Sequence, residues 1–196
     1  MYGIYVGGTV VARFVTPMTV RSNRPVFSSD TLSLKRQSSR RSAQRWEIET
    51  QLEPLSVNAQ ELFVDLVIKG YSEAIQVVMP QNYGVIKART STGTPTAVGT
   101  VGTNSVAVTG NTGLIPKGTF VKFNGSTKVY MTTLDLTGNG TLGVYPNLLA
   151  STSGVFTCKD DVIMTAVYDL DTVIGMTYTD GILMDAGTVK IIEVVP

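Results

Sequence analysis

Three glutamates lie at short, regular spacing beside the only tryptophan of the chain: Glu47, Glu49 and Glu53. Glu47 and Glu49 fall on the same face of a predicted strand, so their carboxyls could pair as general acid and general base. The same alternation is typical of a strand with one solvated face, and this interpretation needs no reaction. The sequence therefore predicts no catalytic residue.

Other side chains with useful chemistry are few. The sequence contains no histidine, which excludes Ser-His-Asp and Cys-His catalysis and the most common metal ligand. The single cysteine, Cys158, cannot form an internal disulfide, and we expect it to be a small buried apolar residue. Asp160-Asp161 and Asp169-x-Asp171 lack the glycine and distal glutamate of a calcium loop, so we expect turn caps there. We expect neither a metal nor a cofactor.

The most strongly charged stretch is residues 35–45, which contain no acidic residue. Such a stretch cannot fold alone, and we interpret it as an exposed loop between two strands that a partner orders. Its cations suit phosphate contacts, but it lacks the interleaved aromatics of a single-strand binding platform, so a solvated or protein-facing loop is the better interpretation. The predicted interface residues are Lys35, Arg36, Arg40, Arg41 and Arg45.

Charge is unevenly distributed along the chain. Eight basic residues and one acidic residue precede Trp46, whereas eight basic and fourteen acidic residues follow from there. This division suits a subunit that docks one surface against an unlike surface of its neighbour. It is equally compatible with neutralisation within one molecule, and both alternatives stay open.

A strand followed by a helix must position the residues around Trp46. Residues 46–51 alternate as a half-buried strand, and Pro54 ends it. Residues 58–70 then predict a helix, with Asn58 and Glu61 as a capping pair and Gly70 at its end. We expect Trp46 to meet Phe63 across this unit. The predicted core consists of Trp46, Ile48, Leu62, Phe63 and Leu66.

The composition predicts a mainly β protein with this one helix. The chain has 196 residues, 43% of them hydrophobic, with 19 glycines punctuating short apolar runs. We expect a hairpin over residues 2–15 that turns at Gly7-Gly8, an irregular stretch over 16–29, and a central strand over 74–79. No apolar run reaches the roughly 18 residues of a membrane span, and the first residues lack a signal-peptide pattern, so we expect a cytosolic origin.

The middle of the chain differs in composition. Residues 90–113 carry no charge and no aromatic, and bulky alternating runs resume after Lys117. Five short strands between about residues 85 and 158 suffice for a small OB-type β-barrel. We therefore predict a discontinuous β-sandwich or barrel-like domain, residues 1–82 with 161–196, interrupted by an inserted OB-like barrel, residues 83–160.

Two stretches carry a resemblance to a known family: Ser39 with Gln44–Glu49 (Q-R-W-E-I-E), and residues 118–148, from G-T-F-V-K-F to V-Y-P-x-L. They resemble tail-tip ring proteins of tailed bacteriophages, the distal tail and baseplate-hub group. The resemblance implies a structural virion protein, made in the bacterial host cytoplasm, that forms a ring, usually hexameric, around the tail axis. It implies the tail tube protein and baseplate hub or wedge proteins as partners, and DNA contact only if the basic loop lines the lumen.

An alternative from another class is an OB-like module that binds single-stranded nucleic acid or carbohydrate. It would require outward aromatics on one barrel face surrounded by Lys117, Lys122 and Lys128. Strand alternation separates Phe120 from Phe123, so we interpret most of these aromatics as core. The candidate aromatics are Phe120, Phe123, Tyr130 and Tyr145.

Overall fold

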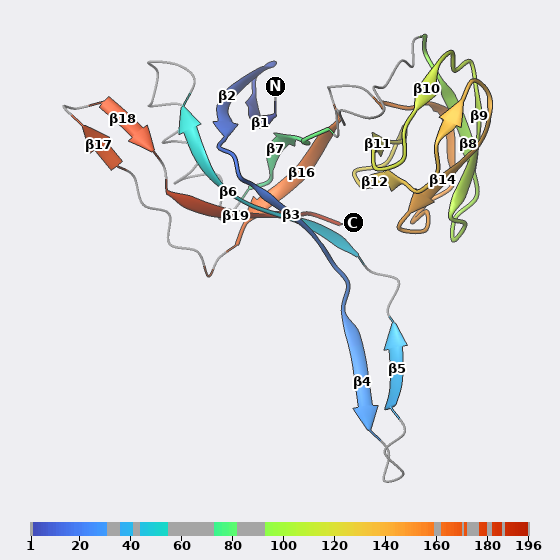
Figure 1. Cartoon of the computed structure of the whole chain (residues 1–196), viewed down its shortest axis with the longest axis horizontal. Coiled ribbons are helices and arrows are strands. Elements are labelled where there is room, and N and C mark those ends of the chain that lie inside the picture. Colours follow the sequence, from blue (N-terminus) through green and yellow to red (C-terminus); the bar gives the residue numbers. More distant parts are fainter. Residues whose placement is uncertain are drawn as a thin grey trace.

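The computed structural model confirms the mainly β class, because in the part it describes the chain is made of antiparallel strands and contains no helix (Figure 1). The described residues are 2–30, 36–40, 44–54, 73–81, 93–158, 162–169, 171, 177–179, 182–185 and 187–195. The predicted helix over 58–70 lies outside them, together with Leu62, Phe63 and Leu66.

Seven strands form the larger sheet, and six of them close into a ring. In order across the sheet they are β19 (Thr188–Glu193), β16 (Ile163–Tyr168), β7 (Ile75–Val78), β1 (Gly3–Val6), β2 (Thr9–Phe14), β6 (Arg45–Pro54) and β3 (Thr19–Asn23). β19 pairs with β6 as well as with β16, so the sheet closes and β3 extends it along β6. Strands from both ends of the chain thus build one barrel, here called the first barrel.

The N-terminal hairpin and the central strand are confirmed. β1 and β2 pair around Gly7 and Gly8, whose φ angles of 56° and 97° are the positive values that a two-residue hairpin turn requires. β7 lies between β1 and β16, which explains its nearly continuous apolar run.

The prediction of irregular structure over residues 16–29 is wrong. β3 pairs with the first half of β6, and β4 (Val26–Asp30) follows it. Four of the five β3 residues are exposed, so the strand has no apolar alternation to reveal it. It forms because the edge of the long strand β6 offers backbone partners.

The prediction of a basic loop over residues 35–45 is wrong for residues 36–40 and for Arg45. Residues 36–40 form strand β5 (Arg36–Arg40), which pairs with β4 as a separate two-stranded sheet, and Arg45 begins β6. The sequence R-Q-S-S-R lacks an apolar face, so only backbone pairing marks it as a strand. Lys35 and Arg41 lie outside the described residues.

A second sheet of six strands lies entirely within residues 96–155. Its order is β11 (Phe120–Lys122), β12 (Val129–Thr132), β14 (Gly140–Tyr145), β9 (Ser105–Thr109), β8 (Thr96–Gly99) and β15 (Thr152–Val155). Lys122 and Thr157 exchange two backbone hydrogen bonds of 2.9 Å, which join the two edges into a partly closed barrel, here called the second barrel. The predicted five strands were therefore too few.

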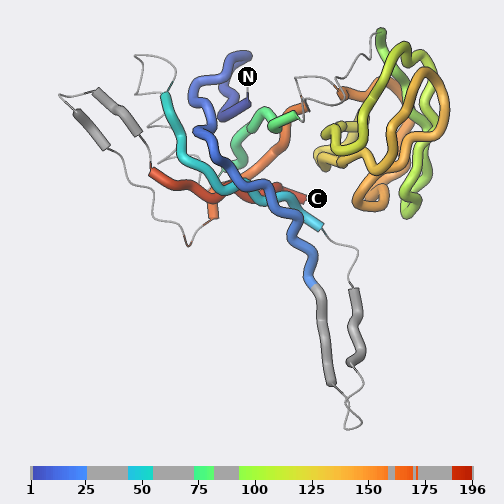
Figure 2. The backbone as a smooth tube through the Cα atoms, in the orientation of Figure 1, coloured from blue at the N-terminus to red at the C-terminus, as the bar shows by residue number. Residues whose placement is uncertain are grey.

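Two short ribbons complete the described strands. β10 (Leu114–Ile115) pairs with β13 (Leu136–Thr137) beside the second barrel, and β17 (Thr177–Thr179) pairs with β18 (Ile182–Asp185). Figure 2 shows residues 93–158, in green to orange, as one body, while both chain ends run through the other. The division into two domains stays a prediction.

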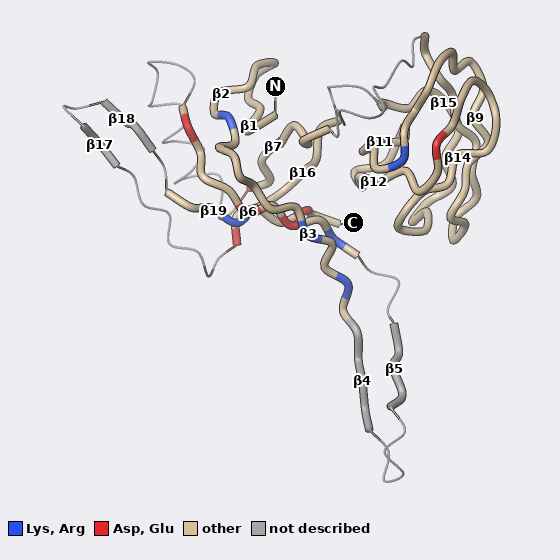
Figure 3. Tube along the Cα trace, viewed as in Figure 1, with Lys and Arg blue, Asp and Glu red and all other residues tan. Residues whose placement is uncertain are grey.

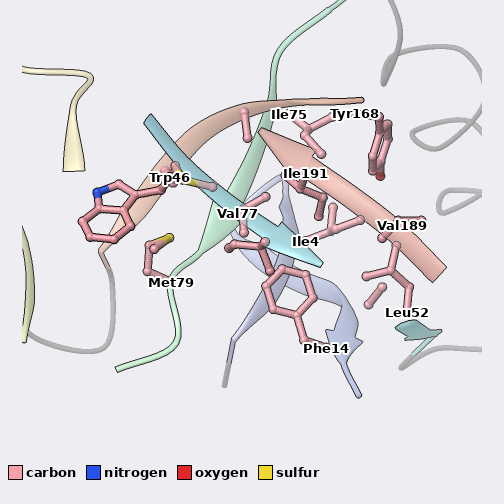
Figure 4. Close-up of a cluster of buried hydrophobic side chains, with 14 of the residues drawn as sticks. Ile4, Phe14, Trp46, Leu52, Ile75, Val77, Met79, Tyr168, Val189 and Ile191 are labelled. Carbon is pink, nitrogen blue, oxygen red and sulfur yellow. The ribbon is translucent and has the colours of Figure 1, made fainter. Parts of the chain in front are cut away.

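Each barrel has its own apolar core, and the first core reaches into the second barrel. Figure 4 shows much of the first core, with Trp46 at one end of the side chains drawn. This cluster also includes Phe120 and Val129, which belong to strands of the second barrel. The second cluster includes Val106, Val108 and Leu142, and also Cys158, which is buried as predicted.

Gly3 offers a test of the β1–β2 pairing. A Cβ atom at this position would lie 1.9 Å from the backbone oxygen of Ala12, and a backbone atom cannot move aside as a side chain can. We predict that Gly3→Ala lowers the free energy of unfolding by roughly 1–3 kcal/mol or more, measured by urea denaturation. The control is Gly7→Asn, where nothing lies within 4 Å and asparagine accepts the turn geometry, so its stability should stay near wild type. Equal stability of Gly3→Ala and wild type would contradict the pairing.

Candidate interaction surfaces and the junction between the barrels

The glutamates of β6 are engaged in ion pairs with neighbouring strands. Arg13 Nη2 lies 2.6 Å from Glu53 Oε2, and Arg21 Nη2 lies 3.0 Å from Glu49 Oε2. All four side chains are substantially exposed, as predicted for a solvated strand face, so each pair stabilises the fold only slightly. The basic N-terminal region is thus partly neutralised within the molecule.

Glu47 differs from Glu49 and Glu53. The sequence predicts it on a solvated face, but its side chain is buried. Its carboxylate accepts hydrogen bonds from Asn23 Nδ2 at 2.6 Å and Arg45 Nε at 3.1 Å, and Lys190 Nζ lies 3.6 Å away. Burial raises the pKa of Glu47, but the Asn23 hydrogen bond and the charges of Lys190 and Arg45 outweigh it and lower the pKa below 4.5. Glu47 is therefore held as a carboxylate, with a structural role.

The cluster around Glu47 extends through Lys190 to Asp169. Lys190 Nζ lies 2.7 Å from Asp169 Oδ2, and this hydrogen bond lowers the pKa of the Asp169 carboxyl and raises that of Lys190. Asp169 also accepts a hydrogen bond from the backbone N–H of Asp171, the turn contact that the sequence predicts. Among the described residues, histidine, cysteine and acidic side chains nowhere gather in threes around a possible metal position.

The carboxylate of Glu193 joins the two barrels. It lies at the end of β19 in the first barrel and accepts hydrogen bonds from three donors. Val129 N donates to Oε1 at 2.8 Å, Trp46 N donates to Oε2 at 3.1 Å, and Lys128 Nζ also donates to Oε2. Lys128 is completely buried, and this burial lowers its pKa although the Glu193 charge opposes the shift.

Trp46 completes this junction. It is 3% exposed, and its Nε1 donates to the backbone oxygen of Val129 at 2.8 Å. Its ring meets Phe120 edge-on, with centroids 5.2 Å apart, and Tyr145 at 6.2 Å. Both Phe120 and Tyr145 belong to the second barrel. Each lies more than 70 residues after Trp46 in the sequence, so the tertiary fold brings them together. The predicted contact with Phe63 lies outside the described residues.

Further side-chain hydrogen bonds connect the barrels, among them one of 3.1 Å between the hydroxyls of Ser22 on β3 and Tyr145 on β14. The Gln81 side chain forms a pair of hydrogen bonds with the backbone of Phe120, accepting from its N–H at 3.0 Å and donating to its oxygen at 3.1 Å. Lys122 Nζ donates to the backbone oxygen of Ile163 at 2.8 Å, and burial lowers the pKa of this lysine. The junction therefore combines apolar packing with polar groups that are satisfied only when the barrels meet.

The predicted interface residues are only partly brought together. Arg36 and Arg40 lie on β5, and Arg45 starts β6, where it pairs with Glu47. Among the predicted core residues, Trp46 and Ile48 are buried. Figure 3 shows charged residues along β3, β6 and β19 of the first barrel, whereas the second barrel is almost free of them.

The aromatics of the alternative binding module form no exposed platform. Phe120, Phe123 and Tyr130 are buried, as the core interpretation predicted, and Tyr145 is partly buried against Trp46. The binding-module alternative also requires lysines around these aromatics, but one of the three candidates, Lys128, is buried.

A pocket of about 470 Å³ lies near β2 in the first barrel. It is bordered by Tyr2, Arg13, Phe14, Val15, Thr16 and Glu53.

The chain matches no protein-family model and no curated protein. Among the described residues, no helix is long and apolar enough to cross a membrane.

The Glu193–Lys128 pair predicts strong coupling between the barrels. Lys128→Met leaves the buried Glu193 carboxylate without its counter-charge, and Glu193→Gln does the same to the buried Lys128 ammonium. Each variant should therefore lower the free energy of unfolding by roughly 3–5 kcal/mol. The double variant should cost clearly less than the sum. Urea denaturation followed by far-UV circular dichroism measures the cycle, while the single tryptophan reports on the junction by fluorescence. Additive losses within about 0.5 kcal/mol would show that the two groups do not interact.

Glu47 predicts an acid-dependent loss of stability. Because its folded pKa is below its unfolded value, its contribution is present above about pH 4.5 and is lost as pH falls through the folded pKa. Wild type should therefore lose stability more steeply than Glu47→Gln between about pH 5 and pH 3, with a constant difference above this range. Chemical denaturation at a series of pH values measures this, and parallel curves would exclude the assigned role.

Proposed function

We propose that this chain is a structural component of a bacteriophage tail tip or baseplate, forming a ring around the tail axis and joining the tail tube to the hub or baseplate. The proposal includes a hexameric ring, an inserted OB-like second barrel, and the tail tube and hub or wedge proteins as partners. Its location would be the virion.

One observation carries this proposal. The two stretches that resemble tail-tip ring proteins meet directly, although about 70 residues separate them. Trp46 of the first stretch packs on Phe120 and Tyr145 of the second and donates a hydrogen bond to Val129. The resembling residues therefore serve to fix one barrel on the other, which suits a part whose work is geometric. A rigid two-barrel unit can present several fixed surfaces to neighbours in a symmetric assembly.

The binding-module alternative has less support. Binding sites for single-stranded nucleic acid and sugars use exposed aromatic faces. Most of the candidate aromatics here are instead buried in the two cores and the junction. The β6 carboxylates, in turn, are occupied by ion pairs with Arg13, Arg21 and Arg45. The arrangement of the described residues favours assembly.

The basic stretch of residues 35–45, here called the basic segment, leads to a prediction about charge and assembly. Arg40→Glu/Arg41→Glu should prevent ring formation, alone or with tail tube protein, while leaving the monomer folded, because reversed charges repel an acidic neighbour. Native mass spectrometry and light scattering measure the assembly, and circular dichroism checks the fold.

The matched control for this experiment is Arg40→Lys/Arg41→Lys, which keeps both charges and should assemble. Normal rings from the charge-reversed protein would remove the basic segment from the proposal. A chain that stays monomeric in the wild-type form, with or without tail tube protein, would contradict the ring itself.

A further inference from the structure

The outer side of the second barrel carries a regular, uncharged surface, here called the neutral face. It lies on the neighbouring strands β15, β8, β9 and β14. More buried and more exposed residues alternate along β15, β8 and β9, and β14 contributes the exposed Thr141. The neutral face consists of Thr96, Val98, Ala107, Thr109, Thr141, Ser153 and Val155.

Strand register places these residues in rows. Val98 lies opposite Ala107 on one side and Ser153 on the other, and Ala107 lies opposite Thr141. Thr96 and Thr109 form the adjacent row, where their hydroxyls are hydrogen-bonded at 2.8 Å. Part of the polar surface is therefore already satisfied within the chain, which lowers the cost of removing it from water.

The absence of charge extends well beyond these side chains. Residues 90–116 and 136–158, which supply all four strands, contain no lysine, arginine, aspartate or glutamate. In Figure 3 the strands labelled β9, β14 and β15 are drawn in tan, the colour of uncharged residues. Meanwhile Val98 is 60% exposed and Val155 53% exposed on the neutral face. Depletion of charge together with exposed apolar side chains is typical of the buried centre of a protein–protein interface.

We propose that the neutral face docks against the neutral face of a second copy of this chain. A charged partner is disfavoured, because its ions would lose water without gaining an opposite charge. The neutral face of a second copy is an uncharged surface of this kind. It is also self-complementary in shape, since the protruding Val98 lies directly beside the small Ala107.

A two-fold axis along the strands, between β8 and β9 and within the plane of contact, satisfies this complementarity. It places Val98 of one copy over Ala107 of the other, and the reverse, as an isologous interface requires. The same operation brings Thr96 over Thr109. The contact then resembles the face-to-face packing of two sheets, with side chains from both layers interdigitating.

The size of the neutral face sets the expected strength. Four strands about 4.8 Å apart, each about five residues long, cover roughly 300–400 Å² per copy. A standard interface buries about 800 Å² per partner, so isolated chains should pair weakly, with a dissociation constant of roughly 10 μM to 1 mM.

Paired lysine substitutions test the neutral face. Val98→Lys/Ala107→Lys places two charges on opposed residues at its centre and should raise the dissociation constant roughly tenfold or more, measured by sedimentation equilibrium of the full chain. Gln51→Lys/Thr188→Lys is the matched control, since these residues also lie opposite each other and are exposed, but on the first barrel. The control should pair as wild type does. Wild type that stays monomeric at about 1 mM, or a lysine variant that pairs normally, would overturn the proposal.

Cysteine cross-linking tests the two-fold arrangement separately. An oxidised mixture of Val98→Cys and Ala107→Cys chains should form disulfide-linked heterodimers in preference to either homodimer, and buried Cys158 should not interfere. No preference for the mixed pair would exclude the axis between β8 and β9. Because none of these variants alters the basic segment, ring assembly through that segment can succeed or fail independently of the neutral face.

Discussion

A single buried carboxylate, that of Glu193, holds the two barrels in one arrangement. It belongs to the last strand of the first barrel, yet two of its donors, Lys128 and Val129, belong to the second. A carboxylate removed from water is tolerable only when its oxygens are well satisfied, and here the third donor is the backbone of Trp46. The polar contacts therefore fix the geometry, while the packing of Trp46 on Phe120 supplies the apolar contribution.

Strand β6 connects this junction to the rest of the first barrel. Its first half pairs with β3 on one side and β19 on the other, and its end pairs with β2. The strand therefore carries Trp46 into the junction, and two of its glutamates form exposed ion pairs with Arg13 of β2 and Arg21 of β3. Because these glutamates pair with arginines of the same chain, part of the charge difference between the basic N-terminal region and the acidic remainder is neutralised within the molecule.

The two barrels differ in surface chemistry although both are antiparallel and closed or nearly so. The first presents paired charges, which keep a surface hydrated and tolerate water around each ion. The second presents threonine, serine, alanine and valine over four strands without any charge. Such a division suits a molecule whose two bodies meet different neighbours, one across a solvated surface and one across a dry one.

The sequence by itself determined the mainly β class, the Gly7-Gly8 hairpin, the central strand β7 and the burial of Trp46, because alternation and turn residues act over a few neighbours. It missed β3 and β5, whose sequences carry no apolar period and which are recognised only by their backbone pairing, β3 with the later strand β6 and β5 with β4. Only the tertiary structure decided that Glu47 is buried, that Glu193 meets Lys128, and that the uncharged strands share one face. Each of these contacts joins residues far apart in the chain, and residue type alone does not choose among distant partners.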